Sequence, residues 1–399
     1  MKIVSDSNNL VEQILISKPE WFSEVMKNAD KHRLQILYTQ IDRDENNRPS
    51  FTSHHYRTNA TDYFYPASTV KMPAAFLALE KLNNLNTEGL NKFTPLRIDS
   101  AFSSQSRVTA DSTSENGLPS IAHYIKKIFL VSDNDAFNRL FEFLGQQYLN
   151  ETLWRKGFEN TKIIRRLESG MSPEENRATN PFTFYDGETI IYEQPPAKNE
   201  RIYKIEMRDV RQGKGYIRSG ELVEEPIDFS NSNYISIENL QGILKAIIFP
   251  EAVPEQQRFN LSEDDYRFLY QYMSMLPRES TYPAYSDTSK YYDSYVKYFL
   301  FGDNREPIPN RIKIFNKVGQ AYGYLIDCAY IIDFENKVEF LLSAVIQVNE
   351  NQIYNDNVYE YNEIGIPFLA NLGRVIYEYE RKRERKHLPD LSKFKWNTD

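Results

Sequence analysis

Several features that mark other classes of protein are scarce in this chain of 399 residues. A single cysteine, Cys328, excludes a disulfide within the chain and a cysteine zinc site. No apolar run approaches the roughly 20 residues that a membrane-spanning helix needs. The five histidines show no metal-ligand spacing, so we expect no metal and no cofactor. These absences favour chemistry that is done by ordinary side chains.

Charge and composition narrow the class further. The formal net charge of −8 argues against a partner that is nucleic acid or an anionic membrane. Hydrophobic residues make up 41% of the chain and charged residues 26%, as in an ordinary globular protein. The segment Met1–Asp6 lacks the apolar region of a signal peptide. Cys328 lies in an apolar run, and we interpret it as a buried core residue.

Strand patterns stand near the two ends of the chain. The segments rich in β-branched and aromatic residues are 34–41, 50–57, 311–317, 324–333 and 338–348. Segments so far apart must share one sheet if neither group is to expose its apolar face. Helical spacing over 9–30, with a restart at Pro19, and over 367–385 predicts helices that cover this sheet. We therefore predict an α/β (α+β) fold with a mainly antiparallel five-stranded sheet flanked by terminal helices.

The pattern in the middle of the chain predicts an inserted, mostly helical lobe. We predict one lobe from residues 1–60 and 311–399 together, and a second lobe over 61–310. Residues 184–235 form a β-rich insertion in the second lobe, because glycines and prolines separate short strand-like pieces there. These pieces are 189–192, 202–207 and 216–217. We expect the active site in the cleft between the lobes.

The first chemical motif is Ser68-Thr69-Val70-Lys71, which precedes a helical run. Residues three apart share a helix face, so Lys71 can reach the Ser68 hydroxyl. A serine hydroxyl is a weak nucleophile and needs such a base. The same spacing recurs at Ser294 and Lys297 in a tyrosine-rich helical stretch, which we interpret as a chance match. The spacing alone is therefore weak evidence.

Two further motifs supply the rest of an acyl-transfer site. Ser132-Asp133-Asn134 lies between two helical runs, where Ser132 can pass a proton to a leaving nitrogen and Asn134 can bind a substrate amide. Taken alone, these residue types favour a helix cap. Lys317-Val318-Gly319 ends a predicted strand, where the lysine can attract a carboxylate and the glycine allows close backbone approach. The N–H groups of Ser68 and Gln320 would form an oxyanion hole, although a plain strand end with a turn glycine fits equally well.

In this order, the three motifs resemble those of the class A β-lactamase and penicillin-interacting serine hydrolase superfamily. The resemblance covers about residues 9–385, apart from the insertion. It implies a β-lactamase/transpeptidase-like fold and an acyl-enzyme on Ser68. The roles implied by the resemblance are those of general base for Lys71, proton transfer for Ser132, substrate binding for Asn134 and Lys317, loop support for Asn138, a structural role for Asp327, and activation of the deacylating water for Glu168. We add Gly319 and Gln320 to the substrate-binding residues because they follow Lys317 at the strand end, although Gln320 replaces the small residue that is usual in the family.

The sequence also departs from the family pattern. Glu168 is followed by Ser169-Gly170-Met171-Ser172, without the asparagine that helps to hold the hydrolytic water in typical class A enzymes. Glu174 and Glu175 are competing candidates for its role. Val318 stands where threonine is usual, which removes a hydroxyl that family members offer to the substrate carboxylate.

Three functions therefore stay open. The first is a hydrolase that opens β-lactam amides through a Ser68 acyl-enzyme. The second is a penicillin-binding-type peptidase, esterase or amidase with slow deacylation, and the third is a catalytically weak binding protein on the same fold. The expected partner is a small-molecule β-lactam or a cell-wall peptide, with a monomer as the expected state. The resemblance also implies a periplasmic or exported protein and a link to antibiotic resistance.

Overall fold

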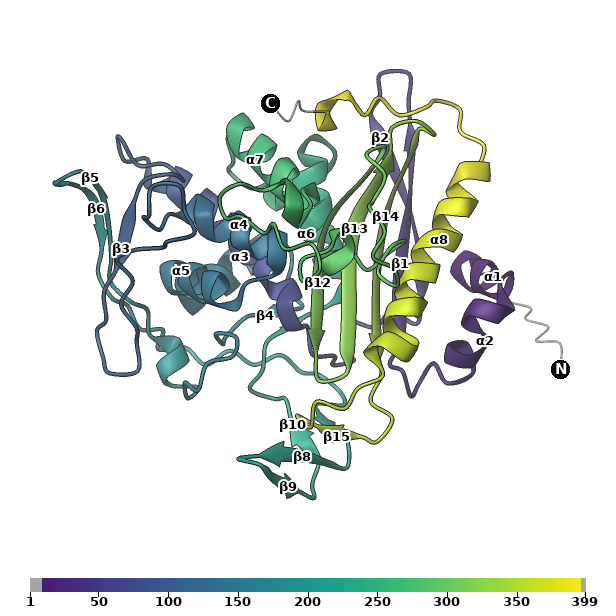
Figure 1. Cartoon of the computed structure of the whole chain (residues 1–399), viewed down its shortest axis with the longest axis horizontal. Coiled ribbons are helices and arrows are strands. Elements are labelled where there is room, and N and C mark those ends of the chain that lie inside the picture. The colour runs from purple at the N-terminus through teal and green to yellow at the C-terminus, as the bar shows by residue number, and fades with distance from the viewer. Residues whose placement is uncertain (1–8, 396–399) are drawn as a thin grey trace.

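The computed structural model describes residues 9–395, and its centre is one five-stranded antiparallel sheet (Figure 1). The strand order is β12-β13-β14-β1-β2. The bounds are β1 (Gln35–Arg43), β2 (Pro49–Tyr56), β12 (Ile312–Ala321), β13 (Tyr324–Asp333) and β14 (Val338–Gln347). Because β1 pairs with β14, the two ends of the chain share one sheet, and the predicted fold class is confirmed.

The burial of each strand follows from its sequence pattern. Every residue of β13 and β14 is buried, as expected for nearly unbroken apolar runs that are covered on both faces. Three helices cover one face of the sheet, as Figure 1 shows. They are α1 (Leu10–Ile16), α2 (Pro19–Lys27) and α8 (Ile366–Lys382). The buried side of α8 includes Phe368, Leu372 and Ile376, so the helix packs through its predicted apolar stripe.

The other face of the sheet contacts the helical lobe. The helices there are α3 (Lys71–Leu85), α4 (Ile121–Val131), α5 (Asn134–Arg155), α6 (Ile237–Ile248) and α7 (Glu263–Ser274). Helix α6 packs directly on the sheet, where the Gln241 amide donates to Leu37 O at 2.9 Å and to Ser343 Oγ at 3.0 Å. Helix α5 has a break in its middle at Gly145, where φ is 73°.

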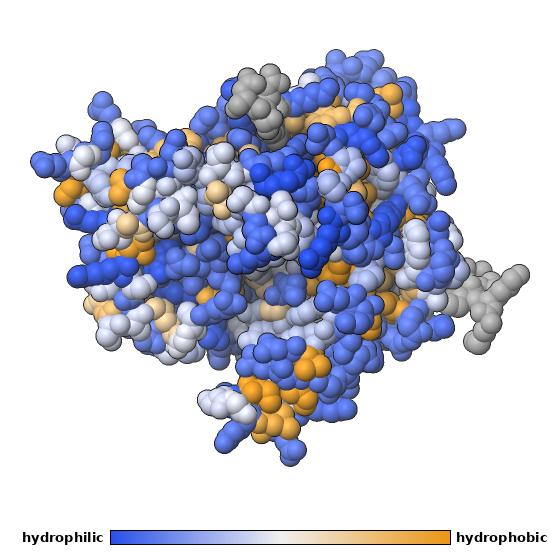
Figure 2. Space-filling view, in the orientation of Figure 1, coloured by the Kyte–Doolittle hydropathy of each residue, from blue (hydrophilic) through white to orange (hydrophobic). Residues whose placement is uncertain are grey.

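The predicted insertion divides into two parts. Strands β5 (Phe182–Asp186) and β6 (Thr189–Gln194) extend β3 (Leu96–Ile98) on the outer side of the helical lobe. The second part projects beyond the end of the sheet (Figure 1). Its strands are β7 (Arg211–Gln212), β8 (Gly215–Arg218), β9 (Glu221–Val223) and β10 (Ile227–Asp228), and β15 (Ile353–Tyr354) pairs with β8. Figure 2 shows apolar side chains gathered on this projection, where Leu222 is 50% exposed.

One strand prediction in this region is wrong. Residues 202–207, all within the described part of the chain, form no strand. Ile202 is 73% exposed, so alternating apolar residues here cross the surface without a neighbouring strand to pair with. The segment meets a partner at its end, where Arg208 bridges to Asp62.

The remaining regular elements are short. They are β4 (Thr161–Lys162), β11 (Tyr234–Ile235), the 3-10 turns Ala67–Val70, Glu175–Arg177, Pro250–Ala252, Glu255–Gln257, Pro277–Glu279, Asp293–Val296 and Ser392–Phe394, and a π-helical turn at Tyr361–Gly365. Over residues 9–395, no helix has both the length and the apolar character to cross a membrane. Met1–Asp6 and the outermost residues of the predicted lobe 1–60 and 311–399 lie outside the described residues.

Candidate active site

The proposed nucleophile lies on a tight turn at the start of α3. Ser68 belongs to the 3-10 turn Ala67–Val70, and the Lys71 N–H donates to its carbonyl. Ala67 has φ 48°, a left-handed conformation that costs free energy for a residue with a Cβ. Ser68 lines a cavity of about 390 Å³ between the lobes. The strained turn therefore presents the hydroxyl to the cavity at the beginning of a helix.

Lys71 lies fully buried at the first position of α3. Its ammonium donates to Asn134 Oδ1 at 2.5 Å and to the Ser132 carbonyl, and it lies 3.4 Å from Ser132 Oγ. Burial lowers the pKa of Lys71 to about 7, although the nearby charges of Asp133 and Glu168 oppose this shift. Near neutral pH a large fraction of this amine is therefore uncharged and able to accept a proton.

The Ser132 motif joins two helices. Ser132 ends α4 with φ 60°, and Asn134 begins α5. Asp133 caps α5, since its carboxylate accepts from the Ala136 N–H at 2.7 Å. The cap and the site occur together: the middle residue holds the helix, while its neighbours contact Lys71.

The third motif lies on the edge strand β12. Lys317 is 2% exposed, and its ammonium donates to Ser132 Oγ at 2.7 Å. Burial lowers the pKa of Lys317 well below its usual value, and the positive charge of Lys71 lowers it further. Two lysines thus converge on one hydroxyl, which gives Ser132 a route for proton transfer between them.

Gly319 brings β12 against the Ser68 turn. An added Cβ at this position would lie 2.8 Å from Pro66 O and 3.2 Å from the Ala67 Cβ. The predicted close approach is thus present, and it is made to the nucleophile turn. The Val318 side chain, 3% exposed, packs in the core that the sheet forms with its covering helices. Gln320 lines the Ser68 cavity and accepts from the Tyr298 hydroxyl at 3.1 Å.

The loop after β4 brings Glu168 to the cavity. Asn138 holds this loop with two hydrogen bonds, from its amide to Leu167 O at 3.0 Å and from the Leu167 N–H to its carbonyl at 2.8 Å. Glu168 follows with φ 50°, is exposed and lines the Ser68 cavity. The competing acids are engaged elsewhere: Glu174 pairs with Arg177 at 2.9 Å, and Glu175 accepts from the Ser104 hydroxyl at 2.6 Å.

A buried polar network supports β12 from behind. Lys297 donates to Asn316 Oδ1 at 2.6 Å, and the Asn316 amide donates to Asp327 Oδ1 at 2.7 Å. Burial raises the pKa of Asp327 above its usual value and lowers that of Lys297 below its usual value. Lys297 of the second Ser-x-x-Lys string therefore supports β12, whereas Ser294 lies outside this network and donates to Asn304 O at 2.7 Å.

Sequence reasoning missed three features of the site. They are the strained Ala67, the network around Lys297, and the tyrosine walls Tyr65 and Tyr322 of the cavity. Alanine and lysine carry no local signal for these roles. The described residues hold no group of three or more His, Cys, Asp or Glu side chains that could bind a metal ion.

Comparisons with known proteins place the chain among related folds. The model of a family described as the beta-lactamase enzyme family matches residues 21–379. The structure described as PBP-A is similar with a TM-score of 0.51 and 15% identity, over 94% of this chain and 97% of that chain. A β-lactamase from Sphaerobacter thermophilus DSM 20745 is similar with a TM-score of 0.48 and 11% identity, over 93% of this chain and 96% of that chain. A class A β-lactamase from Clostridium kluyveri DSM 555 is similar with a TM-score of 0.48 and 15% identity, over 90% of this chain and 98% of that chain. No curated protein matches the sequence.

Proposed function

Because the chain belongs to the beta-lactamase enzyme family, we propose that it is a serine hydrolase that opens β-lactam amides through an acyl-enzyme on Ser68. One observation carries the proposal. Lys71 and Lys317 both lie within 3.4 Å of Ser132 Oγ, and Asn134, which accepts from Lys71, lines the same cavity as Ser68. A base with a lowered pKa and a proton relay thus lie next to the cavity of the proposed nucleophile.

Acylation begins with proton transfer from Ser68 to the neutral Lys71 amine. Ser68 Oγ bonds to the lactam carbonyl carbon, and the N–H groups of Ser68 and Gln320 stabilise the oxyanion. The C–N bond then breaks, and Ser132 donates a proton to the leaving nitrogen while Lys71 returns the proton to Ser132. Lys317 donates a hydrogen bond to the substrate carboxylate, and Asn134 binds the substrate amide.

Deacylation requires an activated water molecule. Glu168 accepts a proton from the water, whose oxygen bonds to the ester carbonyl carbon, and the Ser68–carbon bond breaks as Ser68 regains its proton. Of the three acids proposed for this role, Glu168 is the one that lines the Ser68 cavity. Substrates of this kind favour an exported or periplasmic protein, and turnover would contribute to antibiotic resistance.

A penicillin-binding-type peptidase or esterase with slow deacylation is the second candidate. It is favoured by the exposure of Glu168, whose carboxylate no other described side chain holds in place. A poorly positioned base would leave the acyl-enzyme long-lived. A catalytically weak binding protein is the third, in which the motifs serve only as structure.

A chromogenic cephalosporin and a fluorescent penicillin distinguish these functions. We expect steady hydrolysis of the first reagent by the wild type and its complete loss in Ser68→Ala. Ser294→Ala is the matched control, because it removes the hydroxyl of the same string outside the cavity, and it should retain turnover. A stable penicillin adduct without turnover supports the second candidate. A signal that persists in Ser68→Ala, or no reaction at all, rejects the proposed nucleophile.

A further inference from the structure

A second cavity of about 700 Å³ adjoins the Ser68 cavity. The two cavities share Tyr65, Glu168, Tyr322 and Asn355 in their linings. The outer wall of the second cavity comes from the insertion strands β7, β8 and β10 with the segments between them. A substrate bound at Ser68 can therefore extend past Glu168 into the second cavity. A compact β-lactam nucleus alone would leave this second cavity empty.

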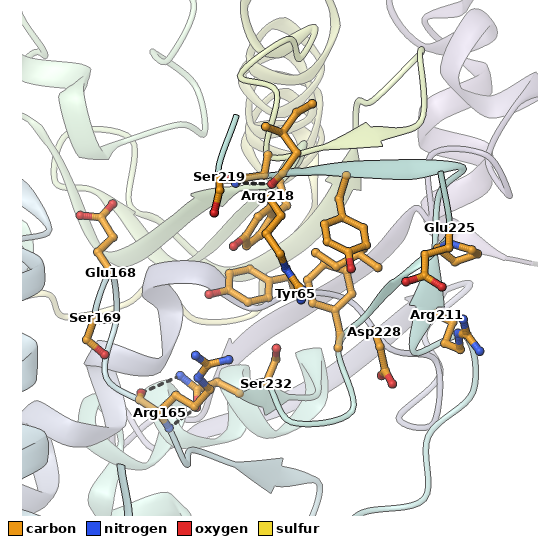
Figure 3. A pocket seen from close by; sticks show the side chains of 18 of the residues that line it. Tyr65, Arg165, Glu168, Ser169, Arg211, Arg218, Ser219, Glu225, Asp228 and Ser232 are labelled. Carbon is orange, nitrogen blue, oxygen red and sulfur yellow. Dashed lines mark hydrogen bonds between the residues drawn. The ribbon is translucent and has the colours of Figure 1, made fainter. Parts of the chain in front are cut away.

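Three arginines that line this cavity form no ion pair with a carboxylate of the described residues, although Arg211, after the hydrogen bonds from Ser230, also lowers the pKa of the nearby Asp228 carboxyl. Arg165 comes from the loop that carries Glu168, while Arg211 and Arg218 come from β7 and β8. Figure 3 shows Arg165 and Arg218 approaching the cavity from opposite sides. Among the described residues, no carboxylate forms an ion pair with any of these three guanidinium groups. Arg218 lies over the Tyr216 ring, 5.3 Å from its centroid.

Other arginines in the same region are paired. The pairs are Arg166 with Glu142 at 2.8 Å, Arg208 with Asp62 at 2.7 Å, and Arg201 with Glu151 at 2.6 Å. Arg166 also lines the cavity, but its charge is compensated by Glu142. Arg165 and Arg218 have no such ion pair among the described residues, so their guanidinium groups are available for a ligand, and the planar fork of a guanidinium matches a carboxylate.

The acidic residues that line the cavity do not take up these guanidinium groups, which remain available for a carboxylate of a ligand. Asp228 accepts hydrogen bonds from the N–H and the hydroxyl of Ser230, at 2.8 and 2.5 Å. Glu225 lies on an exposed segment, and Glu168 stands at the boundary with the Ser68 cavity. In Figure 3, Glu225 and Asp228 lie on the side of the cavity where Arg211 lies, away from Arg165.

The cavity also has an aromatic wall. The rings of Tyr65, Phe229 and Tyr322 contact one another, with centroids 4.9 to 5.6 Å apart. A flat apolar surface next to free guanidinium groups suits a peptide chain with an acidic side chain. We propose that this cavity is a subsite for a carboxylate-bearing, peptide-like extension of the substrate. The inference rests on the proposed acylation of Ser68.

Two penicillins test the subsite. They differ only at the end of the acyl side chain, which is a glutamyl carboxylate in one and a glutaminyl amide in the other. The second-order rate constant of acylation should be about 5- to 10-fold higher for the acidic compound at low salt, and this ratio should be smaller at high salt. Arg165→Gln with Arg218→Gln should abolish this preference. Lys214→Gln, an exposed cation of the same insertion that does not line the cavity, should keep it.

Non-covalent binding to Ser68→Ala separates this inference from the proposed function. The acidic penicillin should bind the Ser68→Ala protein about 5- to 10-fold more tightly than its neutral twin. Equal binding of the two compounds, or undetectable binding of both, overturns the subsite. If the wild type forms no Ser68 adduct with either compound, the proposed function fails, and the ratio of the two Kd values still decides the inference.

Discussion

Lys71 illustrates how burial can change the chemistry of an ordinary side chain. A lysine in water is almost fully protonated at neutral pH and cannot accept a proton. In this structure the amine is fully buried and contacts neutral oxygens from Ser132 and Asn134, and its pKa falls to about 7. The cost of burying the charge thereby supplies the free base that Ser68 needs.

The pH dependence of acylation follows from this shift. Because the uncharged amine is the active form, the acylation rate constant should rise as pH increases through about 7 and level off above it. Stopped-flow measurements with a fluorescent penicillin provide the profile. Lys71→Gln should be slower by about 10²- to 10⁴-fold and should lose the rise near pH 7. A rise that survives in Lys71→Gln would assign the titration to another group.

In the proposed mechanism, Lys71 is needed for acylation, whereas Glu168 acts only afterwards, during deacylation. Glu168→Gln removes the carboxylate that accepts the proton from water but keeps the shape of the side chain. We expect acylation near the wild-type rate, with a penicillin adduct that persists at least about 100-fold longer, measured by intact-protein mass spectrometry. Glu174→Gln in the same loop should hydrolyse normally, because that residue lies outside the cavity lining. Unchanged turnover in Glu168→Gln would exclude this base.

The contact between β12 and the nucleophile turn depends on one missing side chain. A methyl group at Gly319 would meet the Pro66 carbonyl oxygen at 2.8 Å, and a backbone atom cannot rotate away. Gly319→Ala should therefore push the strand from the turn and disturb both the oxyanion hole and Lys317. We expect acylation to fall about 10- to 100-fold, because a misplacement of about 1 Å at a reacting centre can cost about 100-fold.

Gly170→Ala is the matched control for that substitution. No atom lies within 4 Å of an added Cβ at Gly170, and its backbone does not require positive φ. Its acylation rate and melting temperature should match those of the wild type. Wild-type acylation in Gly319→Ala would show that the close approach of β12 is not required for catalysis.

The sheet and the motif positions could be predicted from sequence because their signals are local. The apolar runs of β13 and β14 have one burial pattern, and their predicted bounds agree with the structure to within one residue. The site required elements to meet, as Lys317 does with Ser132 across 185 positions of sequence. No local pattern encodes that one part of the insertion extends β3 while another pairs with β15, or that Ala67 adopts positive φ. These features depend on tertiary packing, which overrides local preference.

The whole molecule combines a rigid centre with a lightly anchored projection. β13 and β14 are paired on both sides and buried on both faces, whereas β8 and β9 contain four and three residues with many exposed side chains. Local opening is easiest where few apolar contacts hold the backbone. Hydrogen exchange followed by mass spectrometry should therefore deuterate peptides from 208–232 within seconds to minutes and leave those from 324–347 protected for hours. Equal protection of both regions would mean that the insertion is fixed as firmly as the sheet. A mobile insertion, in contrast, would allow Arg211 and Arg218 to move toward acidic extensions of different length. The hydrogen bonds around Lys71 and Ser132 would stay fixed during this movement. The geometry of the proposed catalytic residues would therefore not depend on the ligand in the second cavity.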